Sequence, residues 1–385
     1  MKSIINLTAI VVLITLATSC EQSTSLKTLT SCEQQSDMLK FKTIEINEFL
    51  KHPHATEDYQ GLRYEISFTY PSEFENKDVL AILQSKFIEH VLGKKYVSLS
   101  PEDAVKACIE DWKKEYKSDI EDEPFAYEYI YFDTISFVND VLLQMKSYGY
   151  SYKGGAHGSG GFNAILFNIQ TGKEYSRNNI FKLESENNIR TTITSELLKY
   201  WEVEDDTEFF FEEDAVWREE TAFAISSEGI TFLYSDYELG SYALGCPEIT
   251  IPFTDIFPFL YEGTPVWELA KEKIINSLND KTRALLAKKE LNIGSTLEDL
   301  LKCYPKYKIE IYYDEMGFYK YTTLDKMLKN YGKEWHSAYK DWAIFTPLKP
   351  NGEEMSISFF ILFKNLDNLD SCKKQSTIWM VNVSD

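Results

Sequence analysis

The chain of 385 residues lacks the sequence patterns on which most recognisable catalytic sites depend. Its five histidines do not form a zinc-ligand pattern, and neither an HExxH sequence nor an EF-hand loop occurs. The P-loop, GxGxxG and GxSxG spacings are also absent, and nothing singles out one catalytic carboxylate pair. The sequence therefore predicts no catalytic residue, no cofactor and no metal site, and we expect a protein that is not an enzyme.

The chain also lacks an excess of basic residues over acidic residues. The chain carries 61 acidic and 40 basic residues, which gives a formal net charge of −21. This charge argues against non-specific nucleic-acid binding, because neutralising phosphates requires a basic face. The composition is otherwise that of a folded protein, with 44% hydrophobic and 26% charged residues, and the 15% aromatic content favours strands and aromatic-lined contact surfaces.

The N-terminal residues 1–19 have the features of an export signal. Lys2 precedes an apolar stretch from Leu7 to Leu16 that is too short to be a convincing membrane span, and small residues then lead to Cys20. This arrangement resembles a bacterial lipoprotein signal, which implies a lipid on Cys20 that anchors the mature chain to a membrane. The alternative is an ordinary secretory signal cut near Ser19. Both interpretations predict that the mature chain leaves the cytoplasm, and the lipoprotein interpretation predicts a lipid-anchored location in the cell envelope, either periplasmic or facing the surface.

The remaining cysteines are odd in number and contain no CxxC pair. At least one thiol is therefore unpaired within the chain. Because exported proteins can form disulfides, Cys303 and Cys372 are one candidate pair.

Three segments follow the signal. Residues 20–57 are polar and predict a flexible tether, in which His52 and His54 are expected to lie in a solvated loop rather than to bind a metal. Residues 58–263 and 264–385 are expected to form two domains, since residues 20–262 have a net charge of −23 and residues 263–385 a net charge of +1. No internal repeat is present.

Hydrophobic periodicity predicts an α+β fold, with an antiparallel sheet and packed helices followed by a smaller α+β domain. The expected strands and helices of the first domain are listed here in chain order: strand 62–70, a helix around 79–92, a helix from Pro101, strands 127–138, 141–153 and 162–169, a helix 189–200, strands 223–225, 230–233 and 248–252, and a helical turn at 254–260. The second domain is expected to open with one long helix at 266–290. Ser295 to Glu298 predicts a capping box, and strands at 307–313, 318–322, 341–346, 355–363 and 376–383 accompany a helix at 324–332.

A glycine-rich segment, Gly154-Gly155-Ala156-His157-Gly158-Ser159-Gly160-Gly161, joins two of these strands. The glycines predict a tight connection with positive φ angles, and the imidazole of His157 is expected to tie the loop through hydrogen bonds. The alternative makes His157 a general base. Such a base needs a nucleophile or water and an orienting acid, and the sequence indicates none.

Two segments carry a family resemblance. Residues 148–181 run from an aromatic strand through Gly154, Gly155, Ala156 and His157 to Phe162-Asn163, the Thr171-Gly172-Lys173 turn and Phe181. Residues 223–257 add Gly229, Tyr234, Tyr237, Tyr242, Gly245 and Pro252. Together they resemble the RsiV-like domain family, a domain of unknown function, over about residues 60–262. Gly154, Gly155, Ala156, His157, Asn163 and Gly172 are the motif residues expected to have a structural or binding role.

The family includes lysozyme-binding ectodomains of anti-sigma factors, modules attached to peptidoglycan deacetylases, and stand-alone lipoproteins. This chain has neither a cytoplasmic anti-sigma segment nor a following deacetylase domain. The resemblance implies a lipid-anchored, non-catalytic binding protein of the cell envelope, with lysozyme or another cationic protein as ligand. Two alternatives remain: an accessory protein that binds or processes cell-wall glycan, and a scaffold within an envelope complex.

Residues 201–220 are the most acidic stretch, with ten carboxylates, one arginine and five large aromatic residues. One interpretation is a solvated face whose aromatic residues enter the core. The other is an acidic surface with aromatic anchors, suited to a basic protein partner. The candidate partner-binding residues are Glu204, Asp205, Asp206, Glu208, Phe210, Glu212, Glu213, Asp214 and Trp217.

Overall fold

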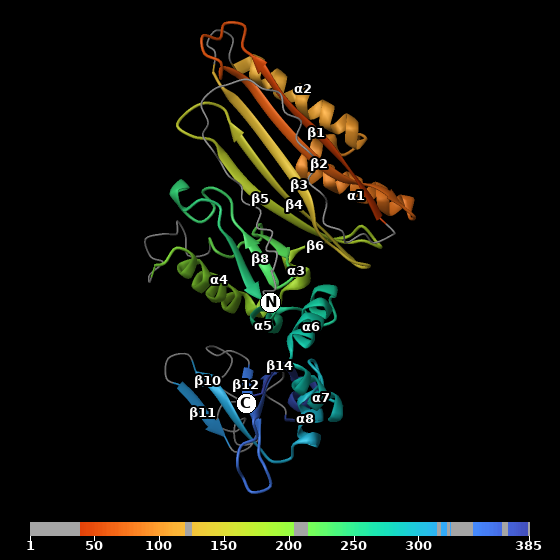
Figure 1. Ribbon diagram of the computed structural model, residues 1–385, viewed down its shortest axis with the longest axis vertical. Coiled ribbons are helices and arrows are strands. Elements are labelled where there is room, and N and C mark those ends of the chain that lie inside the picture. Colours follow the sequence, from red (N-terminus) through yellow and green to blue (C-terminus); the bar gives the residue numbers. More distant parts are fainter. Residues whose placement is uncertain are drawn as a thin grey trace, which may run out of the picture. The chain divides into compact units, whose positions relative to one another are not determined.

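The computed structural model (Figure 1) describes residues 39–119, 125–203, 215–313, 317–321, 324, 342–363 and 369–383. The fold is mixed α+β, as the hydrophobic periodicity predicts, and its strands form three sheets. Residues from Gln35 to Asp385 cluster as one compact unit, so the predicted division at residue 263 stays a prediction.

The first sheet has the strand order β1-β2-β3-β4-β5-β6. Its strands are β1 (Leu39–Lys51), β2 (Gly61–Phe74), β3 (Tyr127–Val138), β4 (Leu142–Tyr152), β5 (Ser159–Asn168) and β6 (Glu174–Tyr175). Neighbouring strands are antiparallel except β2 and β3, which run parallel. The parallel pair requires a crossover, and two helices supply it: α1 (Lys77–Val91) and α2 (Pro101–Asp119).

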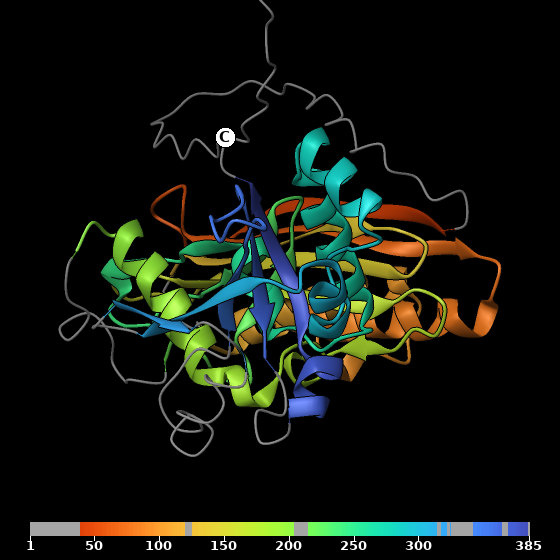
Figure 2. The ribbon, with the colours of Figure 1, turned by 90° about the horizontal axis from the view of Figure 1, so that it is seen from below.

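The two helices cover one face of this sheet, which we call the helix face (Figures 1 and 2). The alternation along β2 explains why they do so, because Leu62, Tyr64, Ile66, Phe68 and Tyr70 all point to this face and are buried. The side chain of Asn76 accepts hydrogen bonds from the first turn of α1, and Ser100 accepts one from the first turn of α2. The opposite face of the sheet carries the alternate residues, and we call it the open face.

A second, three-stranded sheet packs near one end of the open face. It contains β7 (Ala222–Ile225), β8 (Gly229–Leu233) and β9 (Glu248–Pro252). The buried Gln144 side chain of β4 donates to the carbonyl oxygen of Ile225 and accepts from its N–H, which joins the two sheets. Three helices share one hydrophobic cluster with this sheet: α3 (Arg177–Ile180), α4 (Glu186–Tyr200) and α5 (Phe253–Ile256).

The C-terminal residues form a third sheet with the order β11-β10-β12-β13-β14. Its elements are α6 (Pro265–Ser277), α7 (Asp280–Lys288), α8 (Leu297–Cys303), β10 (Tyr307–Tyr313), β11 (Gly317–Tyr321), β12 (Trp342–Pro347), β13 (Ile357–Leu362), α10 (Leu369–Gln375) and β14 (Thr377–Val383). One hydrophobic cluster includes residues from α4, α6 and β13, and Phe257 stacks on Trp267.

Three sequence-based expectations require correction. Residues 39–51 form β1 and not part of a tether, because Ile44 and Ile46 face the helix layer from the sheet edge. The expected helix 266–290 is two helices, since Asn279 caps a new first turn by accepting from the N–H of Thr282. The capping box pairs Thr296 with Asp299, one residue later than expected.

The histidine and cysteine expectations have mixed outcomes. His52 is buried beside Tyr116 rather than solvated, and its Nδ1 accepts from the N–H of His54. Cys303 and Cys372 are both free thiols, so the candidate disulfide is absent. Within the described ranges, no helix is both long enough and apolar enough to span a membrane. Cys20 lies outside these ranges.

Candidate functional site

Aromatic side chains gather on the open face of the first sheet. Phe132, Tyr148 and Phe162 are direct cross-strand neighbours on β3, β4 and β5. Tyr150 and Tyr152 follow Tyr148 at every second position, so they share its face. In the described part of the chain, no helix covers this part of the face (Figure 1), and Phe132 is exposed. Strand alternation therefore produces an aromatic surface outside the core.

His157 extends this surface through two tyrosines that lie about 80 positions later in the sequence. Its ring stacks on Tyr242, with centroids 4.0 Å apart and planes 16° apart. Its Nε2 lies 2.9 Å from the hydroxyl oxygen of Tyr237, and its Nδ1 lies 3.0 Å from the carbonyl oxygen of Gly158. Tyr237 is 44% exposed and Tyr242 is 39% exposed. We call these three residues the His157 cluster.

Backbone pairing brings the two segments of the cluster together. Gly160 donates its N–H to a carboxylate oxygen of Asp236, and the N–H of Asp236 donates to the carbonyl oxygen of Gly160. A side chain at Gly161 would collide with Ser235, and one at Gly160 would collide with the hydroxyl of Tyr148. Close packing at the start of β5 therefore disfavours a side chain at either position. Gly154 and Gly155 have φ angles of 87° and 95°, and Gly172 has one of 68°, as expected for tight turns.

Among the residues that the structure describes, the groups around His157 do not include a nucleophile and an orienting acid placed for catalysis. Both ring nitrogens lie within hydrogen-bonding distance of the tyrosine and carbonyl oxygens already named. Burial and the neighbouring Asp236 raise the pKa of the Cys246 thiol to about 12, so it stays protonated and is a weak nucleophile. This geometry fits the interpretation in which His157 ties the loop.

We expect His157→Ala to lower the free energy of unfolding by about 0.5–1.5 kcal/mol. The reason is the loss of the ring stacking and of the bond to Tyr237, and the value is modest because His157 is exposed. Chemical denaturation monitored by circular dichroism measures it. Tyr237→Phe, which removes only the hydroxyl, should cost less. A His157→Ala protein as stable as the wild type would show that the loop does not depend on this contact.

The structure describes only part of the acidic segment 201–220, so it places only some of the candidate partner-binding residues. The candidate residues from Glu204 to Asp214 lie outside the described residues. Trp217 is only 4% exposed and packs edge-on against Phe181, with the guanidinium of Arg177 over its ring at 4.7 Å. It therefore cannot be an exposed anchor, and at this position the interpretation as a core residue is correct.

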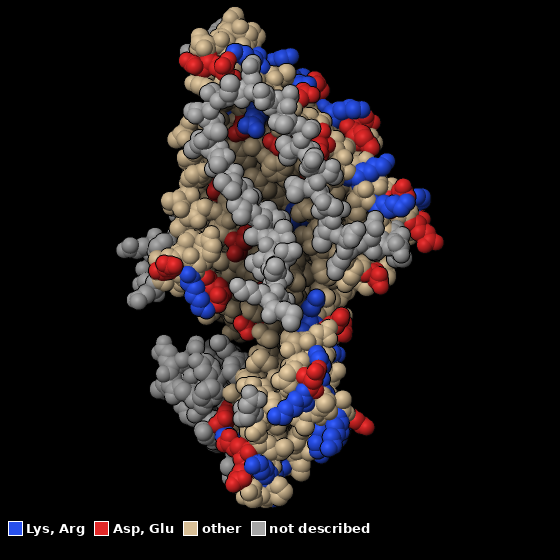
Figure 3. Space-filling view, viewed as in Figure 1, with Lys and Arg blue, Asp and Glu red and all other residues tan. Residues whose placement is uncertain are grey.

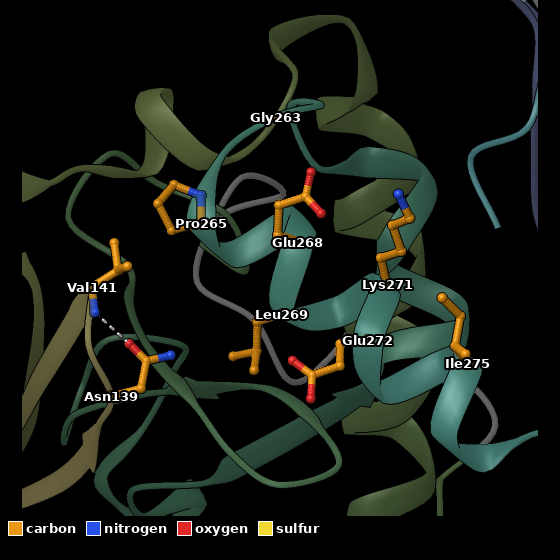
Figure 4. Close-up of a pocket in the computed structure, with 9 residues that line it drawn as sticks. All are labelled: Asn139, Val141, Gly263, Pro265, Glu268, Leu269, Lys271, Glu272 and Ile275. Atoms are coloured by element: carbon orange, nitrogen blue, oxygen red, sulfur yellow. Dashed lines mark hydrogen bonds between the residues drawn. The ribbon is translucent and has the colours of Figure 1, made fainter. Parts of the chain in front are cut away.

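One cavity, of 510 Å³, lies between the β3–β4 turn and α6 (Figure 4). Glu268, Lys271 and Glu272 lie on its helical side, and the side chain of Asn139 is already engaged by the N–H of Val141. These charged groups belong to the outer surface of a helix and do not converge on one point. The cavity is therefore a weaker candidate than the aromatic surface.

Asp133 is an unusual residue that the sequence analysis missed. It is 8% exposed on the helix face, Oδ1 accepts from the N–H of Thr69 at 2.6 Å, and Oδ2 has no partner among the described residues. Burial raises its pKa to about 8. Alternation along 127–138 could have revealed it, because it places this carboxylate on the face of Tyr129 and Tyr131.

The part of the chain that matches a known family includes Tyr237 and Tyr242 of the His157 cluster. Residues 178–254 match the family model DUF3298, described as a protein of unknown function. A DUF3298 family structure from Bacteroides fragilis is similar with a TM-score of 0.54 and 22% identity, over 61% of this chain and 98% of that chain. A DUF3298 family protein from Pseudomonas aeruginosa gives a TM-score of 0.44 and 16% identity, over 58% of this chain and 95% of that chain.

No curated protein matches the chain at a significant level. The likeness to the Bacteroides structure concerns the fold alone, because the sequence identity is low. The motif residues Gly229, Tyr237, Tyr242 and Gly245 lie inside the matched range. Residues 178–254 therefore match the DUF3298 family model, and the α+β fold of the chain is similar to that of the Bacteroides DUF3298 structure.

Proposed function

We propose that this protein is a lipid-anchored, non-catalytic binding protein of the cell envelope, with a lysozyme-like cationic protein as its ligand. The observation that carries the proposal is the His157 cluster, in which two partly exposed tyrosines are held by a histidine beside the aromatic rows of the open face. Tyrosine supplies a large contact area with little loss of side-chain entropy, which suits a protein-binding surface.

The distribution of charge supports a cationic partner. Residues 20–262, which contain the cluster, have a net charge of −23. Over α1 and α2 the acidic and basic side chains alternate and pair, as Lys106 does with Asp103 and Lys113 with Glu110 (Figure 3). The acidic excess must therefore arise elsewhere in these residues, and the 202–214 stretch, with eight carboxylates, is its densest source in the sequence. Such an excess would speed the encounter with a basic protein.

Titrating the mature chain with lysozyme at about 0.15 M salt tests the proposal. We expect saturable binding. Tyr242→Ala should raise the dissociation rate by about tenfold or more, because it removes a desolvated anchor. Tyr59→Ala is a matched control, since Tyr59 is exposed in a loop far from the cluster in the sequence.

Charge neutralisation is the second arm of the experiment. Replacing Glu204, Asp205, Asp206 and Glu208 by their amides should mainly slow association. The control set has the same change in net charge and replaces exposed carboxylates after residue 263: Glu268, Glu272, Glu290 and Glu353. If both sets weaken binding equally and Tyr242→Ala has no effect, the attraction is non-specific. Absence of saturable binding would refute the proposed ligand.

A further inference from the structure

Strand β1 forms a long edge of the first sheet. Among the described residues it pairs only with β2, so along its thirteen residues every second N–H and C=O group points away from the sheet without a backbone partner. Natural edges are usually shielded by short length, a proline, a bulge or a covering segment. β1 contains no proline, and its one irregularity in register lies at its start, between Lys40 and Phe41. This edge can therefore accept another strand.

The apolar side chains of β1 are incompletely covered. Ile44 and Ile46 lie on the helix face and are only half-buried, whereas their direct partners on β2 are fully buried. Phe49 and Leu50, near the end of the strand, are 43% and 38% exposed. Removing such apolar surface from water is favourable. A strand added beside β1 would therefore cover its apolar side chains as well as its free backbone groups.

The sequence of β1 is complementary to its own copy in one antiparallel register. When Glu45 lies opposite its own copy, Lys42 of each chain lies opposite Glu48 of the other. In the same register Ile44 lies opposite Ile46, and both pairs occur twice by symmetry. Opposite charges and β-branched side chains that face each other across strands stabilise the pairing. Sliding the copy by one position in either direction removes both ion pairs and places Lys42 opposite an apolar residue.

We propose that β1 pairs with β1 of a second copy of this chain, antiparallel about a two-fold axis at Glu45, to form a dimer with one continuous sheet. The backbone groups supply the attraction, and the pairs of Lys42 with Glu48 fix the register. Glu48 is held in place for this pairing, because its carboxylate accepts a hydrogen bond from the hydroxyl of Tyr64. The helix faces of both copies lie on one side of the dimer and the open faces on the other. The proposal does not rest on the proposed ligand, since β1 contains no residue of the His157 cluster.

Sedimentation velocity of the mature chain tests the dimer. The chain carries Cys20→Ser, so that no attached lipid can drive association. We expect an equilibrium between monomer and dimer with a Kd of about 1–100 μM. Lys42→Glu should raise this Kd by about tenfold or more, because two pairs of opposite charge become pairs of like charge. Adding Glu48→Lys to Lys42→Glu should restore most of the association. Lys281→Glu, at an exposed position of α7, is the control with the same change in charge.

Substitutions at Glu45 test the register, because this residue is expected to meet its own copy. Glu45→Gln should lower the Kd by about threefold or more, since it removes a pair of like charges from the axis. Glu184→Gln, at an exposed position outside the first sheet, should leave the Kd unchanged. Glu45→Cys should form a disulfide between the two chains on mild oxidation, because Cα atoms of directly opposite residues lie about 4.5–5.5 Å apart. Thr43→Cys should not, since its copy would lie about 14 Å away along the strand.

Thermal unfolding of each variant excludes loss of the fold as the cause of a change. The proposal is overturned if the chain stays monomeric up to about 0.3 mM, or if Lys42→Glu dimerises as well as its control. It is also overturned if the double variant associates no better than Lys42→Glu, or if Thr43→Cys forms the disulfide and Glu45→Cys does not. A dimer that does not bind lysozyme would refute the proposed ligand alone, and a monomer that binds lysozyme would refute the dimer alone.

Discussion

Asp133→Asn is expected to stabilise the protein at pH 8 by several kcal/mol. The carboxyl group is buried, its Oδ2 has no partner among the described residues, and burial raises its pKa from 3.8 to about 8. Ionising it in the folded state is therefore costly. An asparagine has nearly the same shape, stays neutral, and can still accept from the N–H of Thr69 through Oδ1.

The sign of the pH dependence follows from this shift. Between about pH 4 and pH 8 the folded protein retains a proton on Asp133 that the unfolded chain releases. The free energy of unfolding should therefore fall as pH rises through this interval, by up to about 1.4 kcal/mol per pH unit. Below about pH 4 the contribution of Asp133 to stability is fully present and the wild type and variant should differ little.

Urea denaturation at pH 4, 6 and 8 measures this slope. The Asp133→Asn protein should have a flatter profile than the wild type, and Asp140→Asn, at an exposed turn position between β3 and β4, should leave the profile unchanged. Parallel profiles for the wild type and Asp133→Asn would show that this carboxyl is not protonated in the folded protein at neutral pH.

Gly229→Ala is expected to lower the free energy of unfolding by about 3–5 kcal/mol. Gly229 begins β8, is buried, and pairs with Pro252 of β9. A Cβ atom there would collide with the backbone carbonyl group of Ile251, which cannot move without disrupting the β8–β9 pairing. Thermal unfolding and the yield of folded protein measure the effect.

Gly245→Ala separates this collision from the general cost of losing a glycine. Gly245 has a φ of 67°, but nothing lies within 4 Å of a Cβ placed there. Its replacement should cost only the backbone penalty, about 1–3 kcal/mol, because its φ of 67° and ψ of −154° lie in a region that essentially only glycine occupies. If the two variants are equally stable, the packing of β8 on β9 tolerates the extra methyl group and the expectation for Gly229 is wrong.

Short-range patterns predicted the elements of the core well. The alternation along 127–138 and the start of α2 at Pro101 are confirmed. Residues that lie close together in the sequence determine both burial on one face of a strand and helix capping. β1 was missed because an edge strand needs few apolar residues. The break at Asn279 was missed because apolar residues at Ile275 and Leu285 continue the helical spacing across it.

The candidate site was harder to predict because it depends on contacts between distant segments. The glycine-rich loop and the later segment were both recognised, yet no spacing rule states that His157 stacks on Tyr242. The burial of Trp217 had the same cause, since only the packing of Phe181 and Phe232 around it distinguishes a core residue from an anchor. The unpartnered Asp133 also required the positions of its neighbours.

The parallel pairing of β2 with β3 has a consequence for how the chain reaches its fold. Because synthesis proceeds from the N-terminus, the β1–β2 hairpin is complete before α1, α2 and β3 have been made. Until β3 arrives, β2 presents an unpaired edge and its apolar side chains to any other chain nearby. Nascent and refolding molecules should therefore be most prone to aggregate at this stage, and dilute conditions should favour recovery of the native protein.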